Sequence, residues 1–234
     1  MISTMRRNVL RFAIYTVGMM ILAAGLVLNT KTTLGVSPIV SVSNAVSEMS
    51  GMRFGDATLI MYVIFVAVEM VLHRMSGEDL SKEDFLRDVM QLPLSLVFTR
   101  FMNVLGAWIP VFETECAGKF AGTVTGRFLF LLVAICFTGI GAALTLNMRI
   151  VPNPGDGIVQ SIADFTGRKT GTVKNFFDLG CVITTCILSF AITGHVIGID
   201  VGTIAAVIGV GRVISVVNHF LPDFDQNGTV QLEA

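Results

Sequence analysis

Two arginines lie inside apolar stretches of this chain, where a charged side chain is expensive. Arg100 and Arg212 each stand near the middle of a long, mostly apolar segment. An arginine at the centre of a membrane-spanning helix costs about 2.5–3.5 kcal/mol on insertion scales. One hypothesis is that the two side chains line a pathway for a solute. The other is that each pairs with an intramembrane carboxylate such as Asp178 or Glu69, or with backbone carbonyls of a short helix. The two roles are compatible.

Two residue pairs have the chemistry of helix starts. Ser37–Pro38 and Asn153–Pro154 each place a good N-cap residue before a proline, which suits the first helical position. Unpaired N–H groups and the positive dipole end at such a start favour an anion or a carbonyl-bearing solute. Gly155 would let a ligand approach the backbone closely. We therefore predict that both starts bind solute.

Acidic residues supply the remaining candidates. Asp156 lies in the same turn as Asn153 and could cap the helix, bind a cation or take a proton, with capping favoured. Asp178 lies inside an apolar stretch, which makes it a proton-relay or gating candidate. Glu69 is expected to reach the membrane interface or Arg74 instead.

The spacing of these residues indicates an internal duplication. Gly25, Leu28, Pro38, Gly51 and Gly55 recur as Gly141, Leu144, Pro154, Gly167 and Gly171, 116 residues later. Asp88, Arg100 and Pro110 recur as Asp200, Arg212 and Pro222, 112 residues later. Asp88 and Asp200 open apolar stretches, and we predict that they cap helices. In an apolar chain, two copies of one unit are typical of membrane transporters.

The composition is that of a multi-pass membrane protein. Hydrophobic residues make up 53% of the chain, charged residues 14%, and the mean hydropathy is +0.76. Soluble domains carry about 25% charged residues. We predict six membrane-spanning helices, over residues 9–29, 56–74, 89–109, 127–148, 172–194 and 199–220. The lipid bilayer is therefore the expected partner, and the net charge of −1 gives no argument for nucleic acid.

Three spans in each copy is an odd number, so the second copy must insert upside down and form an inverted repeat. The layout is a first repeat over 1–112, an external connector over 113–126, a second repeat over 127–222 and a cytoplasmic tail over 223–234. Ten Lys and Arg residues fall on the side of the N-terminus and four on the other, which predicts both termini in the cytoplasm.

Each copy also contains a short helix, predicted over 37–50 and 153–166 and ending at a glycine. About 13 residues at 1.5 Å each give roughly 20 Å, too short to span a bilayer. Such a helix either lies on the membrane surface or re-enters the membrane. We favour re-entry, in which the two N-termini point at the middle of the bilayer. The fold class is then all-α, with six spans and two re-entrant half-helices.

No catalytic constellation is evident. The four cysteines form no CxxC pair, and the three histidines fall at the ends of spans without shared partners. No motif of a hydrolase, metalloprotease or nucleotide-binding loop is present. We predict no cofactor, no metal and no enzymatic activity.

The first copy resembles the YitT/YczE-like family of bacterial integral membrane proteins. The resemblance rests on Leu34–Gly35–Val36–Ser37–Pro38, on Ser50–Gly51 before Gly55, and on Thr166–Gly167 before Gly171. Ile39 stands where that family often has tryptophan. The resemblance implies five or six helices in a bacterial cytoplasmic membrane and carries over no catalytic residue.

The leading functional hypothesis is a small-solute transporter or channel with a midplane site for an anionic or polar organic solute. The alternative is a membrane-embedded ligand-binding or regulatory subunit that does not transport. A homo-oligomer is compatible with either.

Overall fold

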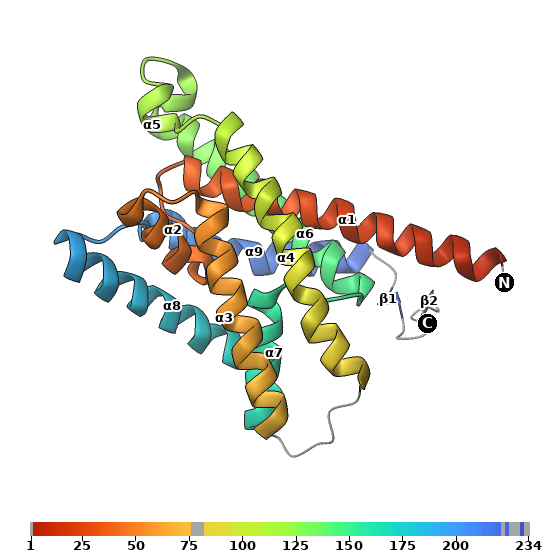
Figure 1. The fold of residues 1–234 in the computed structure, drawn as a ribbon. Helices are drawn as coiled ribbons and strands as arrows, with labels where there is room; N and C mark the ends of the chain where they lie inside the picture. Colours follow the sequence, from red (N-terminus) through yellow and green to blue (C-terminus); the bar gives the residue numbers. More distant parts are fainter. Residues whose placement is uncertain (1, 76–81, 221–222, 225–229, 232–234) are drawn as a thin grey trace.

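The computed structural model describes residues 2–75, 82–220, 223–224 and 230–231 as a bundle of helices (Figure 1). The six long helices are α1 (Ile2–Lys31), α3 (Phe54–Met75), α4 (Lys82–Trp108), α6 (Val124–Met148), α8 (Thr170–Thr193) and α9 (Val201–Phe220). Each contains a segment long and apolar enough to cross a membrane. The six predicted spans are therefore confirmed as helices.

The two short helices also form where the sequence predicts them. They are α2 (Pro38–Ser50) and α7 (Pro154–Thr166), of 13 residues each. Both begin at a proline, and both end at a glycine, Gly51 or Gly167, with φ of 71° and 63°. These left-handed conformations suit a residue without Cβ. The boundaries of both helices thus follow from local sequence.

The centre of the bundle is the antiparallel pair α1 and α6. Near the start of α1, Arg11 donates to the Met148 carbonyl at the end of α6, at 2.7 Å. Near the start of α6, Arg127 donates to the Thr32 carbonyl just beyond α1, at 2.8 Å. Arg127 is buried and also pairs with Glu113, at 2.9 Å.

The short helices pack between the long ones. α2 contacts α3 and α8, and α7 also contacts α3 and α8. In Figure 1, α7 lies alongside the C-terminal part of α3. α4 packs against α1 and α3, and α9 packs against α6. Both short helices have buried apolar faces, so neither stands apart from the bundle.

The connector between the repeats contains α5 (Phe112–Glu115) and a 3₁₀ turn, η1 (Phe120–Gly122). After α9, β1 (Asp223–Phe224) pairs antiparallel with β2 (Val230–Gln231). Pro222, the counterpart of Pro110, and the remaining residues of the predicted tail lie outside the described residues.

Candidate functional site

The N-termini of the two short helices meet inside the bundle. A Cβ atom placed on Gly155 would lie 3.0 Å from Cδ1 of Ile39. Both residues are the second of their helix, and 116 positions separate them. Asn153 caps α7, because its Oδ1 accepts a hydrogen bond from the Gly155 N–H at 3.0 Å. Ser37 precedes α2 as predicted, but its side chain accepts no capping hydrogen bond.

A polar cluster surrounds the start of α7. Tyr62 of α3 is 2% exposed, and its ring hydroxyl faces Asn153 and Asp156. Asp156 does not take the capping role, which Asn153 fills. Instead it interacts electrostatically with Lys174 and with Asp178 of α8. Burial raises the pKa of the Asp156 carboxyl, and Lys174 partly opposes this.

Asp178 is the second carboxylate of this cluster. Its Oδ2 lies 3.7 Å from Nζ of Lys174, one turn earlier on the same helix. Its Oδ1 is buried without a hydrogen-bond partner. The structure thus brings together Asn153, Asp156 and Asp178, all singled out from sequence. Sequence reasoning missed Tyr62 and Lys174, although Tyr62 lies 116 residues before Asp178.

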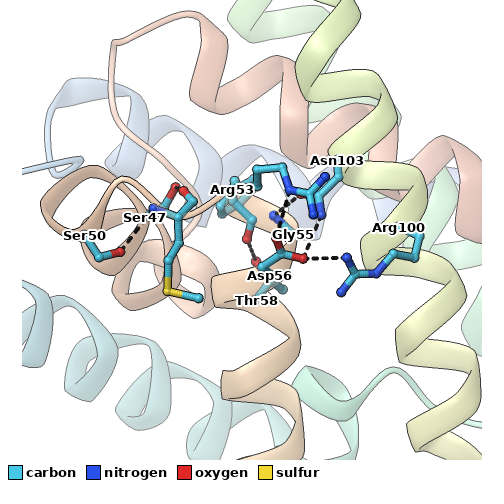
Figure 2. Close-up of polar contacts among 10 residues, drawn as sticks. Ser47, Ser50, Arg53, Gly55, Asp56, Thr58, Arg100 and Asn103 are labelled. Atoms are coloured by element: carbon cyan, nitrogen blue, oxygen red, sulfur yellow. Dashed lines mark hydrogen bonds and ion pairs between the residues drawn. The ribbon is translucent and has the colours of Figure 1, made fainter.

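The two arginines have different surroundings. Arg100 Nη1 lies 2.7 Å from Asp56 Oδ1, so its partner is neither Asp178 nor Glu69 (Figure 2). Asn103 donates to the same oxygen at 2.9 Å, and Arg53 Nε lies 2.9 Å from the other. Asp56 sits in the first turn of α3, where a negative charge is also favoured by the helix dipole. Arg100 is therefore neutralised locally.

Arg212 is exposed on α9, and within the described part of the chain it has no hydrogen bond or ion pair. The repeat explains the difference, because the counterpart of Asp56 is Thr172, which carries no charge. The structure gives no contact between Arg212 and Arg100. The two arginines are thus equivalent in sequence and unequal in environment.

An open cavity of about 290 Å³ lies next to the Arg100–Asp56 pair. Its polar lining includes Lys31, Asn44, Glu48, Arg53 and Asn103. These residues come from the ends of α1 and α4, from α2 and from the turn before α3. The cavity is large enough for a small organic molecule and presents charges of both signs.

A third polar region lies between α3, α4 and α7. Glu69 is 1% exposed, and its Oε2 accepts a hydrogen bond from Gln91 Nε2 at 2.7 Å. The expectation that Glu69 reaches Arg74 or the interface is therefore wrong. A Cβ on Gly157 would lie 2.8 Å from both carboxylate oxygens. The glycine leaves room for the carboxyl group against the first turns of α7.

His73 connects the same three helices. Its Nδ1 lies 2.8 Å from Asp88 Oδ2, and its Nε2 lies 3.1 Å from Ser161 Oγ. His73 thus has two polar side-chain partners that were not identified from the sequence. Asp88 does not cap a helix, because α4 begins at Lys82 and Asp88 is buried within it. In the sequence, the one signal for this polar region is the spacing of Glu69 and His73. They are four residues apart, so they lie on the same face of a helix.

Six long apolar helices with two short helices packed among them define a multi-pass α-helical membrane protein. The chain belongs to DUF6198, a family of unknown function, whose family model matches residues 9–219. No curated protein and no solved structure matches the chain significantly.

Proposed function

We propose that the chain is a small-solute membrane transporter built from two inverted repeats, with a central site at the meeting N-termini of α2 and α7. The contact between Ile39 and Gly155 carries this proposal. Residues at equivalent positions can touch only near an axis that relates the two copies. Opposed half-helices meeting at such an axis are the arrangement in which inverted-repeat transporters bind their solutes.

The packing of α1 against α6 supports the internal symmetry. A Cβ on Gly25 would lie 2.5 Å from Thr138 N, and a Cβ on Gly141 would lie 2.4 Å from Leu22 N. The offset of 116 converts the first contact into the second. Because α1 and α6 are antiparallel, the relating axis crosses them, which favours an inverted repeat over a parallel one.

The contacts of the short helices are related by the same offset of 116 residues. Ser41 of α2 lies 2.7 Å from Thr185 of α8, oxygen to oxygen. The offset converts this pair into Gly157 of α7 and Glu69 of α3, which are also in contact. Burial of both short helices between long ones supports re-entry over a position on the membrane surface.

One difference between the copies favours a carrier over a channel. A Cβ on Gly55 would lie 2.2 Å from the Thr99 carbonyl oxygen, so α3 and α4 pack closely. Among the described residues, a Cβ on the equivalent Gly171 would meet no atom within 4 Å outside the adjacent backbone of its own helix. A carrier opens to one side of the membrane at a time, and in each of these two states its repeats have different conformations. When the carrier changes state, the two repeats exchange conformations, so a single state is expected to show the difference seen here.

The charges near the site favour a polar organic solute. The positive ends of α2 and α7 and the Lys174 ammonium can receive a carboxylate or carbonyl group. Asp156 and Asp178 can bind a donor on the same solute. Arg100 is occupied by Asp56, so we do not assign it to the central site.

We further propose a bacterial cytoplasmic membrane location with both termini inside. Its support is the placement of Lys and Arg together with the resemblance of the Leu34–Pro38 and Thr166–Gly171 motifs to those of the YitT/YczE-like family.

The experiment uses the purified full-length chain. Thermal unfolding in detergent is screened against a panel of small carboxylates, amino acids, amines and sugars, and a stabilising compound is then tested for counterflow in liposomes. We expect saturable flux that is lost in Asn153→Ala and kept in Gln160→Ala, an exposed position on the same helix. Stabilisation without flux would overturn transport in favour of a binding or regulatory subunit.

A further inference from the structure

The Glu69 carboxyl group is buried without a compensating cation. None of the ion pairs in the described part of the chain involves Glu69. Its Oε1 has no hydrogen-bond partner within the part of the chain that the structure describes, although Glu69 is only 1% exposed. A bare carboxylate in such a place is expensive, because neither water nor a positive group replaces its lost solvation. Binding a proton removes the charge.

Gln91, which already donates to Glu69, could also accept a hydrogen bond from the protonated carboxyl group through its Oε1. Gln91 Oε1 and, one turn further along α4, Ser95 Oγ are buried without hydrogen-bond partners among the described residues, and the two residues are 1% and 3% exposed. Both line a cavity of about 10 Å³ beside Asn153 and Pro154 at the start of α7. That volume is about what one water molecule needs. A small cavity whose lining includes Gln91 and Ser95 thus adjoins the proposed solute site.

Other titratable groups near Glu69 provide a path for its proton toward the surface of the protein. Asp88 of α4 interacts electrostatically with Glu69, and His73 lies one turn further along α3. α7 presents Gly157 toward the carboxyl group, while Asp156 interacts with Tyr62 and Lys174. The His73 side chain is 30% exposed, against 6% for Asp88, so the His73–Asp88 pair extends from the buried region toward the surface.

The titratable residues Glu69 and His73 occur in the first copy and have no titratable counterparts in the second. The counterparts of Glu69 and His73 are Thr185 and Ser189, and the counterpart of Gln91 is Thr203. Thr185 and Ser189 satisfy their hydroxyls on backbone carbonyls of α8. A proton site at Glu69 would therefore occur once in each chain.

We propose that Glu69 is a proton-binding site and that the His73–Asp88 pair exchanges its proton with the adjacent aqueous phase. In the transfer, one proton leaves the Glu69 carboxyl group and His73 accepts it. The products are a carboxylate that Gln91 still stabilises and an imidazolium paired with Asp88. No electron moves and no bond to carbon changes. That this proton is coupled to solute movement rests on the proposed function; the proton site itself does not.

The test is infrared spectroscopy of the full-length chain in lipid nanodiscs, without any solute. At pH 7 we expect a protonated-carboxyl band that disappears in Glu69→Gln and remains in Glu48→Gln. A band that survives Glu69→Gln, or is absent from the native chain, overturns the proposal. Sodium ions could be the occupant instead. Stabilisation by sodium chloride but not choline chloride, lost in Glu69→Gln, would also overturn it.

The exchange route has its own measurement. Transfer to deuterated buffer shifts the same band at a rate that we expect to fall by about a hundredfold in Asp88→Asn. Asp200→Asn, the equivalent change in the second copy, should leave the rate unaltered. Equal exchange rates in the two variants would overturn the role of Asp88. Failure of solute flux would leave both spectroscopic results intact, so the two proposals fail separately.

Discussion

The side chain of Ile39 ends against Gly155, and these two residues hold the same position in the two halves of the chain. Each is the second residue of a short helix that begins at a proline. An isoleucine on one side and a glycine on the other let the two N-termini approach, because two large side chains could not share the space. The duplication is thus exact in position and asymmetric in side-chain size.

The contact between Ile39 and Gly155 predicts that the combined size of the two side chains is limited. Gly155→Leu should destabilise the chain by about 1–3 kcal/mol through overpacking, and adding Ile39→Ala should restore much of the loss. The measurement is the midpoint of thermal unfolding in detergent for both single variants and the double variant. Strictly additive effects would argue that the two residues are not in contact in the membrane.

The glycine at the α1–α6 crossing provides a second prediction. Gly141→Ala should lower stability by about 1–3 kcal/mol, since its Cβ would lie 2.4 Å from the Leu22 backbone nitrogen. Gly180→Ala is the matched control, because a Cβ there meets nothing within 4 Å. The control should be neutral or stabilising, as alanine favours a helix by about 1 kcal/mol over glycine. Equal unfolding midpoints for the two variants would contradict the packing described.

A third prediction separates the two arginines. Asp56→Ala and Arg100→Ala should be coupled by about 1 kcal/mol in a double-mutant cycle, because each leaves the other charge without its partner. Arg212→Ala should show no coupling to Thr172→Ala, the equivalent pair in the second copy. Chemical denaturation of the four single variants and two double variants measures both terms. Coupling at the second pair would show that Arg212 contacts α8.

The fourth prediction concerns pH. Burial holds the pKa of Asp156 above its ordinary value in the folded chain. The neutral carboxyl then favours folding below the ordinary aspartate pKa of about 3.9, and this contribution is lost as the pH rises through the raised value. In the native chain the midpoint of thermal unfolding should therefore fall as the pH rises through this range, and Asp156→Asn should remove that fall. Lys174→Met should extend the fall to higher pH and so increase the total loss, because Lys174 opposes the raised pKa of Asp156. An unchanged pH dependence in Asp156→Asn would locate the titration elsewhere.

Local sequence was sufficient for the helices and their ends. Proline at the first helical position and glycine just beyond the last fixed α2 and α7, because φ at a proline and freedom at a glycine are properties of single residues. Six apolar stretches gave the six long helices for a similarly local reason. The offset of 116 residues was also visible without coordinates.

Side-chain partnerships across helices were decided by the tertiary structure alone. Sequence could not tell that Arg100 would meet Asp56 and not Asp178, because the choice depends on which faces of α3, α4 and α8 turn toward one another. For the same reason Glu69 and His73 read as residues of a helix end. Packing of α7 and α4 against α3 buries Glu69 beside Gln91 and places His73 against Asp88, and burial gives a carboxyl group its proton-binding chemistry.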